Sequence, residues 1–162
     1  MSLREQVIAS LDSLACGETL PAGARTIKVD AEGMRLECEL LSVGPLGCLL
    51  SRMTLHTDRL ADVSSGRLRG LSQQLSERLT YLLEPISPIE IDPDGCTVQM
   101  RSNPPHQDDG QTSYYELMVR RGGSLGLSRY TATRGSERHM IAAQVTREVL
   151  ARLIDDFVAV VS

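Results

Sequence analysis

The stretch ECELLSVGPLGCLLSRMT, residues 37–54, decides the fold. In its first segment, apolar and acidic residues alternate. Cys38 and Leu40, together with Leu36 just before the stretch, point to one side, and Glu37 and Glu39 point to the other, which is typical of a half-buried β-strand. The glycines and the proline of VGPLG predict a turn, and CLLSRMTLHT predicts a strand that returns beside the first. The stretch therefore predicts an antiparallel hairpin with one apolar face and one polar face.

The same pattern occurs again 77 residues later, in YYELMVRRGGSLGLSRYT, residues 114–131. Six of the eighteen aligned positions are identical without a gap, including Leu-Ser-Arg-x-Thr in both stretches. A helix-like apolar pattern follows each copy. We interpret this as an internal duplication of a β-hairpin–helix unit, with copies at residues 34–83 and 111–160.

A single strand alignment in both copies would explain why the arginine recurs. Gly122 and Gly123 suit a two-residue hairpin loop, which needs positive φ angles, and such a loop would place Glu116 opposite Arg129. The equivalent alignment of the first copy places Glu39 opposite Arg52. Each half then carries one cross-strand Glu–Arg pair on its polar face, worth roughly 0.2–1 kcal/mol.

An alternative reading gives the arginines a binding role. Arginine side chains form paired hydrogen bonds with carboxylates and phosphates, so the chain could instead build an anion site from Arg52 and Arg129, with Arg134, Arg138 and His139 near the second copy. The sequence leaves both readings open.

The remaining elements are predicted by caps and periodicity. Ser2 and Glu5 form a capping box for a first helix that Gly17 can end. Leucines at helical spacing predict a long helix over residues 59–83, in which Gly66 and Gly70 are unfavourable; either the helix begins only near Gly66, or the glycines allow a close approach to a neighbour. Short strands are predicted at residues 26–30, 89–92 and 96–100, a polar loop at residues 101–111, and a final amphipathic helix capped by Ser136.

The resulting order is α-βββ-α-ββββ-α. Because strands and helices do not alternate one by one, we predict an α+β fold, with an antiparallel sheet and helices packed on one face. Residues 1–162 form a single domain, with an N-terminal helix and two pseudo-repeated halves at about residues 24–83 and 88–161.

Composition argues against two classes of partner. The net charge is −4, and one Phe, four Tyr and no Trp offer little for stacking on bases, which disfavours nucleic acid. No apolar run approaches the ~20 residues of a membrane span, and the N-terminus lacks the basic-then-apolar order of a signal peptide. We therefore expect a cytoplasmic protein.

Catalytic and metal-binding motifs are absent from the sequence. It contains no nucleophile elbow, phosphate loop or dinucleotide fingerprint. His106, Asp108 and Asp109 could ligate a metal, but no second ligand cluster accompanies them, so a polar loop is the preferred interpretation. The cysteines, which form no Cys-x-x-Cys pair, read as buried thiols in preference to a zinc or disulfide framework: Cys16, Cys38, Cys48 and Cys96. We assign no catalytic residue, metal or cofactor, and favour a binding module over an enzyme.

The element order, the small acidic chain and the C-terminal amphipathic helix resemble those of type III secretion chaperones and YbjN-like proteins. The resemblance covers nearly the whole chain and rests on element order, so no binding residue is transferred. It implies a homodimeric cytosolic protein that binds an extended segment of a partner protein. The hypothesis is thus a non-enzymatic protein-binding or chaperone-like module. The alternative is a small-molecule or anion-binding protein, or an enzyme, that uses the Arg/His cluster.

Overall fold

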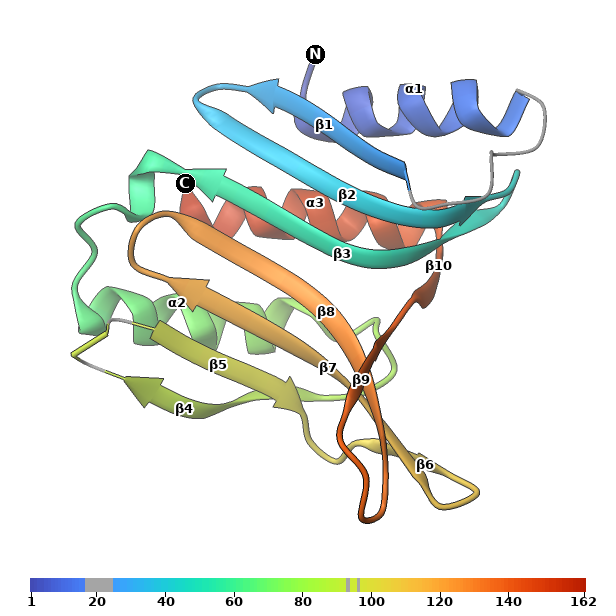
Figure 1. Cartoon of the computed structure of the whole chain (residues 1–162). Coiled ribbons are helices and arrows are strands. Elements are labelled where there is room, and N and C mark those ends of the chain that lie inside the picture. The colour runs from blue at the N-terminus through green and yellow to red at the C-terminus, as the bar shows by residue number, and fades with distance from the viewer. Residues whose placement is uncertain (17–24, 93, 96) are drawn as a thin grey trace.

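The computed structural model describes residues 1–16, 25–92, 94–95 and 97–162, which form an α+β fold with an open antiparallel sheet (Figure 1). The described helices and strands are α1 (Leu3–Cys16), β1 (Arg25–Ala31), β2 (Met34–Val43), β3 (Gly47–Thr57), a 3-10 turn (Asp58–Leu60), α2 (Ser65–Arg78), β4 (Ile86–Asp92), β5 (Thr97–Ser102), β6 (His106–Asp108), β7 (Gln111–Arg120), β8 (Ser124–Thr133), β9 (His139–Ile141), β10 (Ala143–Thr146) and α3 (Arg147–Val161). The helices lie against one face of the sheet, as predicted, and leave the other face open.

The two central strands of the sheet are β3 and β8. The strand order is β1-β2-β3-β8-β7-β5-β4, so the two hairpins predicted from the sequence meet along the β3–β8 seam. Beyond the paired part of the seam, β9 pairs with the end of β8 and β10 pairs with the start of β3. Strand β6 pairs with the first three residues of β7.

The first helix has the predicted capping box. The backbone N–H of Glu5 donates to Oγ of Ser2 at 3.1 Å, and the backbone N–H of Ser2 donates to Oε2 of Glu5 at 2.7 Å. The helix contributes three buried side chains to the core: Leu3, Val7 and Leu11. The predicted end of the helix at Gly17 lies outside the described residues.

The first hairpin has the predicted register. Glu39 faces Arg52 and Cys38 faces Met53 across β2–β3. Next to this region the pairing is irregular, because Ser51 of β3 and Leu41 of β2 have no partner in the β2–β3 ladder. The interruption lets Leu40 and Leu50 both remain buried although Leu41 is 49% exposed.

The second hairpin is one residue out of the predicted register. Arg120 pairs with Ser124, so the turn holds three residues instead of two, and Glu116 faces Ser128 while Arg129 faces Tyr115. We attribute the longer turn to its packing against β3. Gly123, at φ +113°, lies so close to Thr57 that an added Cβ would be 2.5 Å from the Thr57 carbonyl oxygen. The predicted Glu116–Arg129 pair is therefore wrong, and the two hairpins do not share one alignment.

The second helix is shorter than predicted. It begins at Ser65, with the Ser64 hydroxyl accepting from the Arg67 backbone N–H, and it ends at Arg78. The late start agrees with the first of the two alternatives left open by the glycines. The leucines of the predicted stripe are nevertheless buried, because the 3-10 turn and the segment after the helix place them in the same core: Leu60, Leu68, Leu71, Leu75, Leu79 and Leu82.

The last helix begins eleven residues after the predicted cap at Ser136. Thr146 is the N-cap, and its hydroxyl accepts from the Val149 backbone N–H at 3.1 Å. Residues before it form β9 and β10, where Ala143 and Val145 are buried in alternation with exposed neighbours, as in a strand. Tertiary pairing with β3 and β8 thus overrides the helical spacing of this segment. The predicted loop at residues 101–111 likewise contains β6.

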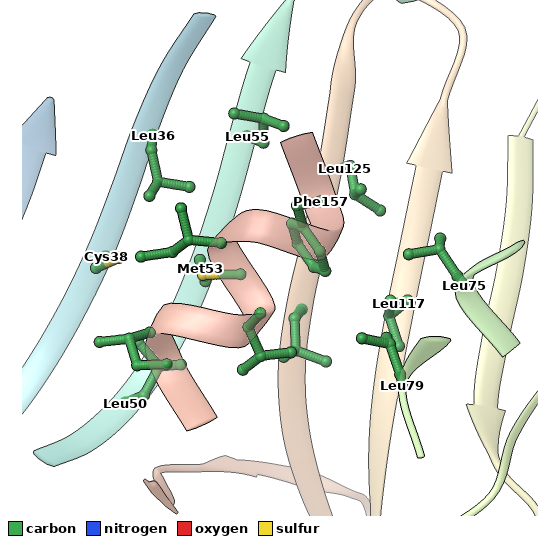
Figure 2. Close-up of a cluster of buried hydrophobic side chains, with 14 of the residues drawn as sticks. Leu36, Cys38, Leu50, Met53, Leu55, Leu75, Leu79, Leu117, Leu125 and Phe157 are labelled. Atoms are coloured by element: carbon green, nitrogen blue, oxygen red, sulfur yellow. The ribbon is translucent and has the colours of Figure 1, made fainter. Parts of the chain in front are cut away.

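The core lies between the helices and the covered face of the sheet. Figure 2 shows Phe157 of α3 between the side chains of Leu55 on β3 and Leu125 on β8, while Leu75 and Leu79 lie toward Leu117. Phe157 is fully buried, so α3 packs across the seam that joins the two hairpins. Within the described residues, no helix combines the length and the apolar character needed to cross a bilayer.

Candidate functional site

The candidate site is on the open face of the sheet, where no helix packs. Side chains alternate along a strand, so the residues opposite the core project from this face. Cross-strand pairing arranges them in rows that run from β2 to β5. The first row is Glu39, Arg52, Ser128, Glu116 and Arg101, the second is Glu37, Thr54, Gly126, Met118 and Gln99, and the third is Arg35, His56, Ser124, Arg120 and Thr97.

Side-chain length along these rows creates a depression. On β8, each row is occupied by a residue with a short side chain or none, namely Ser124, Gly126 or Ser128, and Thr54 on β3 adds a fourth in the second row. Longer side chains stand on both sides of them, from β2 and from Arg52 and His56 of β3 on one side and from β7 and β5 on the other. The result is a hollow of about 660 Å³, open to solvent, which we call the open-face hollow.

One side of the open-face hollow is acidic and loosely paired. Glu39 Oε2 lies 3.8 Å from Arg52 Nε, and Glu37 Oε2 lies 4.0 Å from His56 Nε2. These separations exceed normal hydrogen-bond lengths. Because the four side chains are also between 29% and 47% exposed, each can turn toward a ligand without breaking a strong internal bond.

The opposite side contains a tightly bonded cluster around Glu116. This side chain is 6% exposed, and its Oε2 accepts from Arg138 Nη1 at 2.6 Å, from Gln99 Nε2 at 3.0 Å and from Arg101 Nε at 3.1 Å. Burial alone would raise the pKa of the Glu116 carboxyl, but the hydrogen bonds from Arg138, Gln99 and Arg101 outweigh burial and lower the pKa below its ordinary value. Glu116 is therefore a permanent anion at neutral pH.

Two tyrosines hold the arginines of this cluster in place. The guanidinium carbon of Arg138 lies 4.0 Å from the centroid of the Tyr130 ring, and that of Arg101 lies 4.9 Å from the Tyr114 ring. The two rings stack on each other at 6.0 Å. Such cation–π contacts favour a fixed guanidinium position, so Arg138, which precedes β9, is held over the end of the open-face hollow.

The predicted anion site is not assembled. Arg52 lies on the open face, whereas Arg129 lies on the covered face, where its Nη2 is 2.9 Å from Oε2 of Glu84 and its guanidinium stacks on the Tyr115 ring. Arg134 is exposed in the turn after β8, and His139 is exposed on β9 opposite Thr131. Of the predicted cross-strand pairs, Glu39–Arg52 is confirmed, and Glu116 obtains its arginines from β5 and from the segment before β9.

Sequence reasoning missed most residues on the β7 side of the open-face hollow. One pattern could have indicated Gln99, Arg101 and Arg120: they are polar residues that alternate with the buried Val98 and Met100 or follow the buried Val119. Arg138 was named in the anion-site alternative, but its place beside Glu116 was missed, because that segment was predicted to be helical.

Other candidate ligands do not assemble into a site. Within the described part of the chain, no group of three or more His, Cys, Asp or Glu side chains is placed to hold a metal ion. Cys38 and Cys48 are buried free thiols, and burial raises the pKa of Cys38 to about 12 and that of Cys48 to about 11. Cys96 and the side chain of Cys16 lie outside the described residues.

Comparisons of the chain with protein-family models, with curated proteins and with solved structures find no match in any of the three.

Proposed function

We propose that this protein is a non-enzymatic, chaperone-like binding module that holds an extended segment of a partner protein in the open-face hollow. The observation that carries the proposal is the line of short side chains along the seam between two polar walls. Ser124, Gly126 and Ser128 occupy every second position of β8, so short side chains line the floor over five residues of strand. At about 3.3 Å per residue, this length suits an extended segment of roughly five residues.

The shape of the hollow favours a chain segment over a small metabolite. Small-molecule sites usually enclose most of the ligand surface and are lined mainly by apolar groups. The open-face hollow is instead open to solvent and lined mainly by charged and hydroxyl side chains. Polar side chains and backbone groups of a bound segment could be paired by Thr54, Ser124 and Ser128 without burying an apolar surface.

The chemistry of the hollow also favours binding over catalysis. A catalytic pair needs an acid or base with an appropriate pKa beside a reacting group. Glu116 has a lowered pKa, and its carboxylate accepts hydrogen bonds from three side chains. Such a carboxylate is poorly suited to accept or release a proton near pH 7.

Two related predictions remain proposals. We propose that the two hairpins arose by duplication, since β2 and β7 start at residues 34 and 111, and β3 and β8 start at residues 47 and 124, with the same offset. The resemblance to type III secretion chaperones, with the homodimer and cytoplasmic location that it implies, is a second proposal. Binding in the hollow requires neither.

The experiment selects peptides from a random phage-displayed library on the purified protein, and then compares two matched variants. Gly126→Gln places a long side chain on the floor of the hollow; its Cβ would meet only ordinary contacts, at 3.8 Å from Met53 O and Thr54 Oγ1. Gly70→Gln makes the same change on α2, where a Cβ meets nothing within 4 Å.

The expected result is that Gly126→Gln weakens binding of the selected peptides by roughly tenfold, equivalent to about 1.4 kcal/mol, while Gly70→Gln does not. Circular dichroism checks that both variants are folded. Equal binding by the two variants, or failure of the library to yield a binder, would overturn the proposal.

A further inference from the structure

We infer that the segment held in the open-face hollow carries a carboxylate, which docks between Arg52, Arg120 and Arg138. The inference rests on the proposed function and adds the chemical class of the ligand. It follows from the charges around the hollow and from the number of arginine donors that the protein itself leaves unused.

The β7 side of the hollow has an excess of positive charge. Arg101, Arg120 and Arg138 stand there against a single carboxylate, Glu116. The Arg120 guanidinium is exposed and donates to no group within the described residues. Two arginines share the charge of Glu116, so Arg120 and part of the charge on Arg138 remain available to an anion from outside.

Arg52 adds a third cation from the β3 side. Its nearest carboxylate, Glu39, is 3.8 Å away, and its Nη2 contacts the Met140 sulfur at 3.9 Å, which is a weak acceptor. Arg52 pairs across the seam with Ser128, beside the floor of the hollow. An anion on this floor would therefore meet arginines from both sides.

Glu116 provides an example, within the protein, of a carboxylate held by the arginines of this surface. Its carboxylate accepts from Arg138 at 2.6 Å and from Arg101 at 3.1 Å, with Gln99 as a further donor. Charge-assisted hydrogen bonds of this kind are stronger than hydrogen bonds between neutral groups. A carboxylate from a partner would use the remaining donors of the same arginines, in competition with Glu116.

The acidic wall limits how many carboxylates the ligand can bring. Glu37 and Glu39 stand on β2, one strand from the floor, and would repel a segment with several acidic residues. The ligand class is therefore a segment with one Asp or Glu over the floor, and not a polyanion. Side chains of the bound segment that lie toward β2 should be neutral or basic.

The test uses propionate, whose single carboxylate matches that of a glutamate side chain. The full chain is titrated with propionate at constant ionic strength, and the arginine Nε–Hε signals are followed by NMR, with propionamide as the uncharged control. Three variants are compared: Arg120→Gln in the hollow, Glu116→Gln beside it, and Arg69→Gln on the exposed side of α2 as the matched control.

We expect saturable shifts of Arg52, Arg120 and Arg138 with propionate and none with propionamide. Arg120→Gln should weaken binding about threefold, the loss typical of one partly exposed ion pair. Glu116→Gln should tighten binding, because it releases Arg138 and Arg101 from their internal competitor. A merely structural Glu116 would leave the affinity for propionate unchanged.

The inference is overturned if propionate and sodium chloride shift the signals alike, or if Arg120→Gln and Arg69→Gln behave alike. Failure of this test is distinguishable from failure of the proposed function. If selected peptides still depend on Gly126 while propionate does not bind, the hollow binds segments by another chemistry. If neither binds, both proposals fail.

Discussion

Glu116 and Arg129 lie on opposite faces of the sheet, although the sequence places them in positions equivalent to the Glu39–Arg52 pair. Glu116 belongs to the open face, where Arg138 and Arg101 neutralise it. Arg129 belongs to the covered face, where it pairs with Glu84 at 2.9 Å and both side chains are 13% exposed. The two arginines of the repeated motif, Arg52 and Arg129, therefore lie in very different surroundings, one exposed and one largely buried.

Removing Arg129 should cost far more stability than removing Arg52. Arg129→Ala leaves the Glu84 carboxylate buried without its partner, for which we expect a loss of about 3 kcal/mol. Arg52→Ala removes an exposed pair at 3.8 Å and should change stability by less than about 0.5 kcal/mol. Urea unfolding at pH 7 measures both.

A double variant separates the charge from the packing. Arg129→Met with Glu84→Leu removes both charges and should recover most of the stability lost in Arg129→Ala, because a buried ion pair can often be replaced by apolar groups. Equal losses for Arg129→Ala and Arg52→Ala would contradict the burial of the Arg129–Glu84 pair.

The Glu116 cluster should make stability depend on acid pH. Hydrogen bonds from Arg138, Gln99 and Arg101 overcome burial and lower the folded-state pKa of Glu116. Its contribution is therefore complete above the unfolded pKa of about 4.3 and is lost as the pH falls through the lower folded value. The free energy of unfolding of wild type should exceed that of Glu116→Gln by about 2 kcal/mol at neutral pH.

The difference in the free energy of unfolding between wild type and Glu116→Gln should become smaller at acid pH. Urea unfolding at about pH 7, 5 and 3.5 measures it: the first two values should agree and the third should be smaller. A difference that grows as the pH falls would mean that the folded-state pKa of Glu116 is raised, against the bonding seen here.

The sequence was sufficient where a local pattern and its tertiary role agree. The alternation of residues 34–40 fixes which side of β2 is buried, and the Ser2–Glu5 capping box fixes the start of α1. Both signals depend on neighbours in the chain. The open polar face followed directly from the first of them.

The sequence was insufficient where a distant strand decides the outcome. The turn at Gly122 and Gly123 gains its third residue because it packs on Thr57 of another hairpin. Residues 139–146 have helical spacing but fill the gap beside β3 and β8. These two contacts decide where Arg129 and Arg138 lie, and hence the site. No pattern within either segment predicts them.

Gly47 should be the least replaceable glycine of the first hairpin. An added Cβ would lie 2.4 Å from the Val145 carbonyl oxygen, so Gly47→Ala must push β10 away from β3. We expect a loss of at least about 2 kcal/mol, comparable to other overpacked sites. In contrast, Gly70→Ala in α2 meets no atom within 4 Å and should stabilise the protein by up to about 1 kcal/mol. Thermal unfolding of both variants tests this, and similar melting temperatures would contradict the close approach of β10.

The buried thiols should be inert in the folded protein. Burial raises the pKa of Cys38 to about 12 and that of Cys48 to about 11, so almost no thiolate forms near pH 8. Iodoacetamide labelling followed by peptide mass spectrometry should leave both residues unmodified in native protein and modified in urea. Rapid native labelling of Cys38 would show that the β2 core face is accessible.

Binding in the open-face hollow is tested most directly by titrating ¹⁵N-labelled protein with a library-selected peptide. The largest backbone shifts should occur at Thr54, Ser124, Gly126 and Ser128, and they should disappear in Gly126→Gln. Shifts confined to the three helices or to the outer strand β1, with the seam unaffected, would show that the partner binds elsewhere.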